Sequence, residues 1–436
     1  MIKGFSKLTK EEKRNWVCNR YLSSNLEGID IFSKYDLSDK KLQSLHDDFI
    51  ENTIGNYLLP FAIAPNFFID GRYYTVPMVL EESSVVAAVS KATKFWSERG
   101  GFRCEIQNME KVGQIHLFYE GDKQILFNFF NQVEPILYKE TESLTENMRK
   151  RGGGISSIIL KDMTDNLEHH YQVFVTFLTG DAMGANFINS CLEQMTQIIE
   201  REALIHLSEG SLEVLMSILS NYTPQCLVRA EVSAPLSEMT YNDIEGNIFA
   251  RDFVRAIAVA DADVYRAVTH NKGVMNGVDA VVIATGNDFR AVEAACHAYA
   301  CRGGKYKSLT QAYIKEDRFH FKIELPLAIG TIGGLTKLHP MVKIALKILE
   351  NPTAEILMKI IACVGLAQNF AAVSSLITHG IQKGHMKMHL NNILNQLQAN
   401  EEEKKVLTAY FKDKTVTHSE VKRELERLKL TTNANN

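Results

Sequence analysis

The spacing of hydrophobic positions along the 436-residue chain changes repeatedly between the period of a helix and that of a strand. Near the N-terminus, Thr9 followed three residues later by Glu12 has the pattern of a capping box, so a helix should begin there. Further helices are predicted at 40–49, 85–96, 137–150, 185–206, 289–301 and 362–378. Strands are predicted within 59–80, around the turn signal Asp70-Gly71-Arg72, and at 115–118, 124–130, 171–178, 279–284 and 319–325.

The order of these elements predicts a mixed α/β protein with more than one domain. Between about 110 and 225, the order strand, strand, helix, strand, helix indicates one compact α/β sandwich. We expect this sandwich to be inserted into a larger domain that resumes near Val228. In that larger domain the run DAVVIA at 279–284 is apolar almost throughout, as in a strand that is covered on both faces.

The C-terminal part of the chain has a different composition. From Glu401 onward it is rich in Lys and Glu, and Thr417 with Glu420 predicts another capping box. We therefore expect a small helical unit at the C-terminus. It follows the segment 379–384, whose two glycines would allow a hinge.

Composition places the chain among ordinary globular proteins and excludes several other classes. Hydrophobic residues make up 45% and charged residues 23%, which rules out a disordered chain, a collagen-like repeat and a disulfide-stapled miniprotein. Lys plus Arg number 48 and Asp plus Glu 52, giving a net charge of −4, whereas nucleic-acid binders usually have a basic excess. The seven cysteines include no Cys-x-x-Cys pair, which argues against a zinc ribbon or a disulfide framework and favours a reducing, cytoplasmic environment.

No export or membrane segment is expected from the sequence. Residues 1–14 are charged and lack the apolar core of a signal peptide. The apolar stretch 360–377 contains Gln368, Asn369 and two serines, while crossing a bilayer takes about 20 predominantly apolar residues. We interpret it as a buried core helix.

The first candidate site is the segment TGDAMGAN at 179–186, between a predicted strand and a predicted helix. Backbone N–H groups at a helix N-terminus favour an anion such as a pyrophosphate, and Gly180 and Gly184 would let it approach closely. The alternative is an ordinary helix start capped by Thr179 or Asp181. Because neither a Gly-x-Gly-x-x-Gly fingerprint nor a Walker P-loop occurs, a standard Rossmann domain is disfavoured.

Two further candidates flank the DAVVIA run. Lys272, in NKGVMNG at 271–277 just before it, is placed to polarise a carbonyl and to stabilise oxyanion charge as a desolvated ammonium. The alternative is a solvated lysine in a loop. Asp288, directly after the run, could tune a neighbouring base, or it could simply cap the following helix.

Acids and histidines supply the remaining candidates. Glu81 and Glu82 precede an apolar helix, where a carboxyl in a dry cleft can act as a general acid, or where acids simply favour a helix N-terminus. His385 and His389 share one helix face, but no third ligand follows, so we expect no metal site. A histidine beside a glycine hinge is better interpreted as a mobile general acid.

Several sequence blocks, taken together and in this order, point to one enzyme family. They include the specific blocks ENTIG (51–55), DAMGAN (181–186) and NKGVMNG (271–277). Supporting blocks are GFSKLTKEEK (4–13), VPMVLEESSVVAA (76–88), RGGG (151–154), ILSN (218–221), TGNDFRAVEA (285–294), GTIGG (330–334), LAQNFAA (366–372) and IQKGHM (381–386). Over nearly its whole length the chain resembles the class II, bacterial-type 3-hydroxy-3-methylglutaryl-coenzyme A (HMG-CoA) reductases.

The resemblance implies an α/β (α+β) fold with a large mixed substrate domain, an inserted small ferredoxin-like cofactor domain and a small helical C-terminal flap. In residue ranges, 1–109 and 225–378 would form the HMG-CoA-binding domain, 110–224 the NAD(P)-binding domain and 379–436 the mobile flap. Because the active site of this family lies at a dimer interface, a homodimer or an assembly of dimers is implied, with neither nucleic acid nor membrane as a partner.

The resemblance also implies a four-electron reduction of HMG-CoA to mevalonate and free coenzyme A by two reduced nicotinamide cofactors. By motif position, Lys272 would polarise the thioester carbonyl, and Glu82, not Glu81, would be the catalytic acid. Asp288 would hydrogen-bond within this Lys–Glu cluster and tune its protonation. His385 would protonate the leaving coenzyme A thiolate.

Binding roles follow from the same motif positions. Arg266 would pair with the carboxylate of the substrate. Supporting substrate contacts are implied for Ser84, Asn276, Gln368, Glu51 and Asn52. Contacts with the dinucleotide are implied for Asp181, Met183, Gly184, Asn186, Asn221 and Ser157.

One departure from the family pattern bears on the cofactor. Some members place an acid near 155–157, where this chain has Ser156 and Ser157 beside the basic run 149–151. Serines and nearby cations would tolerate a 2′-phosphate, so NADPH is favoured over NADH. Two alternatives stay open, a non-catalytic acyl-CoA-binding homologue and a reductase of another acyl-CoA.

Overall fold

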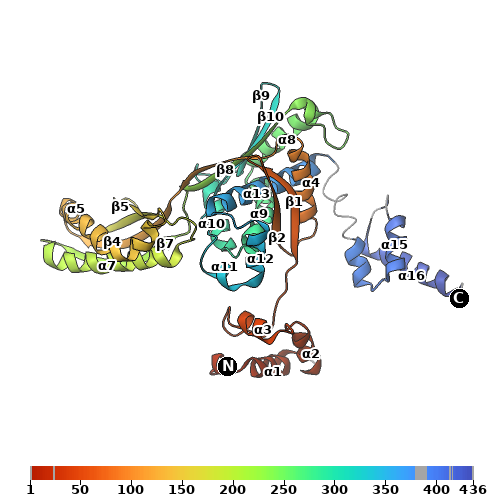
Figure 1. Cartoon of the computed structure of the whole chain (residues 1–436), viewed down its shortest axis with the longest axis horizontal. Helices are drawn as coiled ribbons and strands as arrows, with labels where there is room; N and C mark the ends of the chain where they lie inside the picture. The colour runs from red at the N-terminus through yellow and green to blue at the C-terminus, as the bar shows by residue number, and fades with distance from the viewer. Residues whose placement is uncertain (1, 23–24, 379–389, 412–413, 415, 435–436) are drawn as a thin grey trace. The chain divides into compact units, whose positions relative to one another are not determined.

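The computed structural model describes residues 2–22, 25–378, 390–411, 414 and 416–434. The chain divides after Pro60 into two compact units, which are described one at a time (Figure 1). Helices and antiparallel sheets both contribute to the described residues, so the predicted mixed α/β class is confirmed. The finer domain ranges expected from the sequence stay predictions.

The N-terminal unit consists of short helices. Its elements are η1 (Phe5–Lys7), α1 (Lys10–Tyr21), α2 (Asn25–Lys34) and α3 (Lys40–Asp47). The predicted capping box is present, because Thr9 Oγ1 accepts from the Glu12 amide at 3.2 Å and the Thr9 amide donates to the Glu12 carboxylate at 2.8 Å. Asp39 caps α3 in the same way, accepting from two amides of its first turn.

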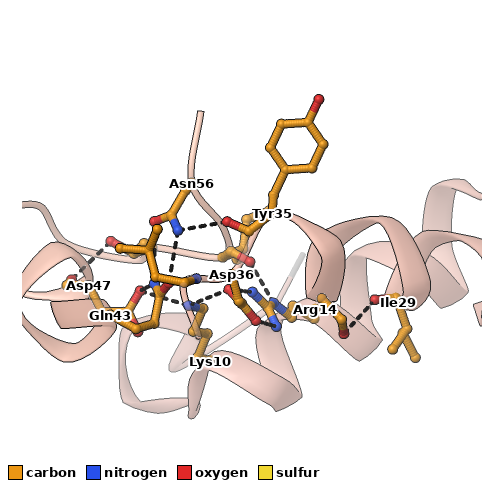
Figure 2. Close-up of polar contacts among 12 residues, drawn as sticks. Lys10, Arg14, Ile29, Tyr35, Asp36, Gln43, Asp47 and Asn56 are labelled. Atoms are coloured by element: carbon orange, nitrogen blue, oxygen red, sulfur yellow. Dashed lines mark hydrogen bonds and ion pairs between the residues drawn. The ribbon is translucent and has the colours of Figure 1, made fainter. Parts of the chain in front are cut away.

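A buried arginine ties these helices to the segment that follows them (Figure 2). Arg14 is only 8% exposed and donates to both carboxylate oxygens of Asp36, at 2.8 and 2.6 Å. Its Nε donates to the Ile54 carbonyl at 2.6 Å, and Asn56 donates to the Tyr35 carbonyl at 2.8 Å. The hydrogen bonds from Arg14 hold the pKa of Asp36 below its usual value of 3.8, although burial acts in the opposite direction.

The larger unit contains two sheets that share one hydrophobic core. The ribbon of β1 (Phe61–Ile69) and β2 (Arg72–Val79) is antiparallel. The second sheet has the order β3-β8-β10-β9, with antiparallel neighbours. Its strands are β3 (Arg103–Met109), β8 (Cys226–Pro235), β10 (Arg318–Pro326) and β9 (Thr310–Lys315). The remaining elements are α4 (Val85–Ser97), η2 (Leu236–Glu238), α8 (Gly246–Ala262), α9 (Val264–Ala284), α10 (Phe289–Ala300), α11 (Leu335–Leu338), α12 (Pro340–Ile348) and α13 (Ala354–Ile377).

Two long helices, α9 and α13, cross closely within this core. A Cβ added at Gly277 would lie 2.9 Å from the Val364 carbonyl oxygen, and one added at Gly365 would lie 2.9 Å from a methyl group of Val278. Glycine at these two positions therefore allows the helix backbones to approach. Among the described helices, α13 alone is long and apolar enough to cross a membrane, yet 78% of its apolar window is buried within the fold. The predicted core helix is confirmed.

A small antiparallel sheet is inserted between β3 and β8. Its element order is β4 (Lys111–Glu120), α5 (Lys123–Glu140), α6 (Glu142–Arg149), β5 (Gly154–Asp162), β6 (His170–Leu178), α7 (Ala185–His206) and β7 (Ser211–Ser220). The sheet order β5-β6-β4-β7 with helices after the first and third strands is the ferredoxin-like arrangement (Figure 1). Apolar side chains from the sheet, α5 and α7 form a core of their own.

Two predicted strands were wrong. The range 124–130 lies in α5, because Asp122 caps that helix by accepting from the Gln124 amide, and its buried side chains recur at helical spacing. The run 279–284 is the last part of α9, which is buried on nearly all sides. A short apolar run looks the same in a buried helix as in a buried strand, so periodicity could not separate the two.

The C-terminal residues contain helices around a small apolar core, as expected. Residues 390–396 are helical and are followed by α15 (Glu401–Tyr410) and α16 (His418–Ala434). The Thr417 hydroxyl accepts from the Glu420 amide at 3.3 Å and donates to the Glu420 carboxylate at 2.9 Å, in agreement with the predicted cap. The expected hinge at 379–384 lies outside the described residues.

Candidate active site

The centre of the candidate site is a contact between Lys272 and Glu82. Nζ of Lys272 donates to Oε2 of Glu82 at 2.7 Å. Glu82 lies in the turn between β2 and α4, whereas Lys272 lies in the middle of α9 and not in a loop before a strand. The two side chains are 61% and 41% exposed, so the expected desolvated ammonium is not found in the single chain.

Buried polar residues fix the part of α9 that carries Lys272. His270 bonds to the Thr310 hydroxyl at 2.6 Å, and burial lowers the pKa of this histidine to about 3, so it stays neutral. Asn271 donates to the Lys307 carbonyl at 2.8 Å and accepts from the Leu309 amide at 2.9 Å. The sequence interpretation missed this network, although polar residues beside an apolar helix face could have indicated it.

Most of the predicted substrate-binding residues of the larger unit lie on α9, on α13 or at the start of α4. Asn276 is one turn beyond Lys272, and the Cβ of Gln368 lies 3.0 Å from where a Cβ at Gly277 would be. Gln368 is 6% exposed, and its Oε1 has no hydrogen-bond partner among the described residues. Ser84, at the N-cap of α4, has a φ of 73°, a strained conformation that is typical of functional sites.

Arg266 is a half-buried cation in the first turn of α9. Burial lowers its pKa. Within the part of the chain that the structure describes, it forms no ion pair with a carboxylate. A cation in this position is suited to an acidic ligand.

Asp288 serves as a helix cap in the single chain, and its implied role beside Lys272 and Glu82 stays a prediction. It follows helix α9 and caps α10, accepting from the amides of Arg290 at 3.0 Å and Ala291 at 3.3 Å. Although burial raises the pKa of Asp288, the hydrogen bonds and charge of Arg290 outweigh it, so the pKa is lowered. No hydrogen bond joins Asp288 to Lys272 or Glu82, and the capping alternative is what the single chain shows.

Two predicted substrate contacts lie in the N-terminal unit. Glu51 and Asn52 are exposed in the turn after α3, and Asn52 has a φ of 57°. The bond from Arg14 to the Ile54 carbonyl holds the end of this turn. The predicted flap acid His385 lies outside the described residues.

The segment TGDAMGAN joins β6 to α7. Neither predicted side chain caps α7, because the N-cap is Gly184 at a φ of 87°, without a capping side chain. Asp181 instead accepts from the Ala354 amide, at the start of α13, at 2.7 Å. The first amides of α7 are therefore not satisfied by a side-chain cap, as an anion site requires.

A buried lysine that the sequence interpretation missed supports this loop. Lys111 is 3% exposed, and its Nζ donates to Thr179 Oγ1 at 2.6 Å, the Ala182 carbonyl at 2.8 Å and the Ile329 carbonyl at 3.4 Å. Burial lowers its pKa. The sequence signal that could have identified this residue is a lysine at the start of the alternating apolar strand KVGQIHLF.

A small, mostly apolar pocket opens beside this loop, lined by Lys111, Met183, Asn221 and Thr223 among others. The Thr223 hydroxyl is buried and has no hydrogen-bond partner among the described residues. Apolar walls with a few polar groups are typical of small-molecule sites. The pocket thus contains two of the predicted cofactor residues.

The other predicted cofactor residues lie around the same end of the small sheet. Asn186 is exposed in the first turn of α7. Ser157, on β5, shares a hydrogen bond with the Thr176 hydroxyl at 2.7 Å. A Cβ on Gly180 would lie 3.7 Å from the Arg151 carbonyl oxygen, so the glycine-rich turn before β5 faces the TGDAMGAN loop.

Comparison with known proteins agrees with this geometry. A family model described as hydroxymethylglutaryl-coenzyme A reductase matches residues 10–390. The HMG-CoA reductase of Archaeoglobus fulgidus is 37% identical over 433 residues, which is 98% of this chain and 94% of the relative. The probable HMG-CoA reductase of Borreliella burgdorferi is 31% identical over 423 residues, 96% and 93% of the two chains.

Solved structures give the same result. The HMG-CoA reductase of Streptococcus pneumoniae superposes with a TM-score of 0.73 and 33% identity, covering 98% of this chain and 99% of that one. The class II enzyme of the same organism, bound to NADPH in open conformations, gives a TM-score of 0.72 and 34% identity over 86% and 99%.

Together with these matches, the fold and the lysine–carboxylate contact define an oxidoreductase. The chain belongs to the HMG-CoA reductase family. The resemblance seen in the motifs is confirmed, and so is the function that it indicated, HMG-CoA reductase of the mevalonate pathway.

Proposed function

We propose that the chain reduces HMG-CoA to mevalonate and free coenzyme A, consuming two NADPH and two protons. The observation that carries the proposal is the 2.7 Å contact between Lys272 Nζ and Glu82 Oε2. Each hydride addition to a carbonyl carbon places negative charge on the oxygen. A fixed cation stabilises that charge, and a neighbouring acid can then supply a proton.

Within this reaction the two residues have separate tasks. The Lys272 ammonium holds the thioester oxygen and stabilises the oxyanion of the hemithioacetal. Glu82 donates a proton to the aldehyde oxygen during the second reduction. The cofactor, when bound, supplies the hydride for each reduction. Protonation of the coenzyme A thiolate is assigned to His385.

Substrate binding is assigned to the residues around this pair. Arg266, half-buried and without a carboxylate partner among the described residues, would bind the free carboxylate of the HMG group. Gln368, whose Oε1 is unsatisfied within the described fold, would contact the acyl group together with Asn276 and Ser84. For Glu51 and Asn52 a substrate contact stays a prediction that rests on the family motif alone.

The dinucleotide is assigned to the β6–α7 loop. The first amides of α7, behind Gly184, would bind the pyrophosphate. Asp181, Met183, Asn186 and Asn221 would contact the rest of the cofactor, and two of them, Met183 and Asn221, line the small pocket beside the loop. The related S. pneumoniae enzyme was solved with NADPH, which supports this choice of ligand.

NADPH is proposed as the preferred cofactor because of the charges before β5. Arg149 is paired with Glu142 at 2.9 Å and Lys150 with Glu146 at 2.7 Å. Arg151 is exposed and forms no ion pair within the described residues. It is therefore the cation of this run that is available for a 2′-phosphate, with Ser157 nearby on β5.

A homodimer is proposed from the exposed face of α9. Val264, Tyr265 and Val268 are 49%, 85% and 50% exposed, and Lys272 follows one turn further along. A second copy placed on this face would cover the apolar side chains and remove water from the ammonium. The Lys272 ammonium, which is exposed in the single chain, would then be desolvated as the sequence predicted.

The test is the loss of reduced-nicotinamide absorbance with HMG-CoA, run in parallel with NADPH and NADH. Consumption of two cofactors for each coenzyme A released, with lower KM for NADPH, is the expected result. Folded protein that consumes neither cofactor would be a non-catalytic homologue. Faster turnover of acetyl-CoA than of HMG-CoA would indicate that the chain is a reductase of another acyl-CoA.

A further inference from the structure

Two cysteines far apart in the sequence are in contact inside the larger unit. Sγ of Cys104, on β3, lies 3.2 Å from Sγ of Cys363, on α13. All seven cysteines of the chain are described, and all are free thiols. Cys301 is the exposed one, and the structure places it in no thiol contact.

The surroundings of the pair make the two thiols unequal. Cys104 is partly exposed, whereas Cys363 is fully buried. Burial, followed by the contact with Cys104, raises the pKa of the Cys363 thiol well above its usual value. Peroxide can reach the partly exposed Cys104 but not the fully buried Cys363, so Cys104 is the sulfur that reacts first.

An ion pair lies next to the thiols and fixes the backbone around them. Nζ of Lys359, one turn before Cys363 on α13, donates to Asp70 at 2.9 Å. The Cys104 amide donates to the other carboxylate oxygen of Asp70, also at 2.9 Å. The same carboxylate therefore holds the backbone of Cys104 and the side chain of Lys359, which fixes β3 beside α13 at the thiol pair.

We propose that Cys104 and Cys363 form an oxidative modification site, which closes to an intrachain disulfide when the chain meets a peroxide. The Cys104 thiolate attacks one peroxide oxygen, giving a sulfenic acid and hydroxide. The Cys363 sulfur then attacks the sulfenic sulfur, the S–O bond breaks, and the departing hydroxide takes the Cys363 proton. In total, two thiols and one hydrogen peroxide give one disulfide and two waters.

The disulfide would have two consequences. It would protect Cys104 from further oxidation to sulfinic acid, which most cells cannot reverse. It would also join β3 to α13 across 259 positions of sequence, with the whole ferredoxin-like sheet inside the closed loop. Because a disulfide has a sulfur–sulfur bond of about 2.05 Å, α13 and β3 need move together by only about 1 Å.

The test uses the whole chain carrying Cys301→Ser, so that the exposed thiol does not react. After treatment with hydrogen peroxide, mass spectrometry of the intact protein should show the loss of two hydrogens. Peptide mapping without reductant should show Cys104 linked to Cys363, and dithiothreitol should reverse both changes. The unfolding temperature should rise by a few degrees on oxidation and fall back on reduction.

Single-cysteine variants test the order of the two steps. In Cys363→Ser, peroxide should convert Cys104 to sulfenic and then sulfinic acid, because no second thiol traps the intermediate. In Cys104→Ser, the buried Cys363 should stay unmodified. The proposal is overturned if the parent protein gains oxygen at Cys104 without cross-linking, or stays unchanged at a peroxide dose that fully oxidises Cys301 in the wild-type chain. Neither readout depends on reductase activity.

Discussion

Lys272 Nζ and Glu82 Oε2 are 2.7 Å apart although their residues are separated by 190 positions in the sequence. Lys272 is fixed by the buried helix α9, and Glu82 by the turn that leads into α4. Both side chains are largely exposed in the single chain, so their replacement should leave the fold intact. A loss of activity on replacing either residue can therefore be attributed to the loss of its catalytic group and not to misfolding.

Replacing Glu82 by glutamine should lower kcat by about 10²- to 10⁴-fold, the usual contribution of a general acid. Glu81→Gln is the matched control, because Glu81 is the adjacent exposed acid and makes no contact with Lys272 in the structure. Its kcat should stay close to that of the wild type. Steady-state rates with HMG-CoA and NADPH measure both variants. Equal losses in the two would remove Glu82 from its proposed role.

Arg151→Gln should reduce kcat/KM for NADPH about tenfold, as expected for loss of one charge-assisted hydrogen bond, and leave the value for NADH nearly unchanged. Arg149→Gln and Lys150→Gln remove the same charge from residues already paired with Glu142 and Glu146. Their effect should be clearly smaller. The measurement is kcat/KM for each cofactor. An equal loss in all three variants would indicate that the overall positive charge of 149–151 matters, and not a contact between Arg151 and the phosphate.

Gly277→Ala should destabilise the fold by about 1–3 kcal/mol, the usual cost of overpacking a core. The new Cβ would lie 2.9 Å from the Val364 carbonyl oxygen, which belongs to the backbone of α13 and has no room to move. Gly273→Ala is the matched control in the same helix, since its Cβ would meet nothing closer than 3.9 Å. Calorimetry should show a lower unfolding temperature for the first variant only. Equal unfolding temperatures for the two variants would contradict the close approach of α9 and α13 at Gly277.

Asp36→Asn should weaken the N-terminal unit by about 2 kcal/mol near neutral pH, the usual value of a hydrogen bond to a charged group. Because the folded pKa of Asp36 is lowered, its contribution is complete above the ordinary value of 3.8 and is lost as the pH falls below it. The difference between the variant and the wild type should therefore shrink in acid.

Urea unfolding followed by the fluorescence of Trp16, which lies in α1, measures this effect. A Trp16→Phe protein identifies which transition belongs to the N-terminal unit. Asp30→Asn is the control, because its i,i+4 pair with Lys34 is exposed on both sides and should contribute little. A difference for Asp36→Asn that does not vary with pH would contradict the ion-pair explanation.

The sequence correctly predicted the elements whose ends carry a recognisable signal, such as a capping residue or a glycine. Helix α7 was placed at 185–206 and is found there, and the caps at Thr9 and Thr417 are present. The run 279–284 was misassigned because α9 is buried on almost every side, and burial of this kind removes the helical period from the sequence. Tertiary packing, and not local preference, decides such a segment.

The candidate site was predictable to a similar degree. The motifs indicated Lys272 and Glu82, which the fold brings together, but Asp288 was expected in the same cluster and is found as a helix cap. The strand that begins with Lys111 marks this residue as unusual, but its three acceptors could not be predicted from its sequence neighbours, since they come from 179–182 and 329. Contacts of this kind depend on how strands far apart in the chain are brought together.

The ferredoxin-like sheet leaves and re-enters its host at adjacent points, because Met109 at the end of β3 is paired with Cys226 at the start of β8. Topologically, the whole insertion is the loop of a β-hairpin, and the host sheet would remain continuous if a tight turn replaced it. Two neighbouring strands thus carry both covalent connections of the inserted sheet, and hydrogen bonds from the Ala354 amide to Asp181 and from Lys111 to the Ile329 carbonyl hold it against its host. An insertion joined at two adjacent strand ends leaves the host sheet order β3-β8-β10-β9 unbroken, and with it the core that supports Lys272.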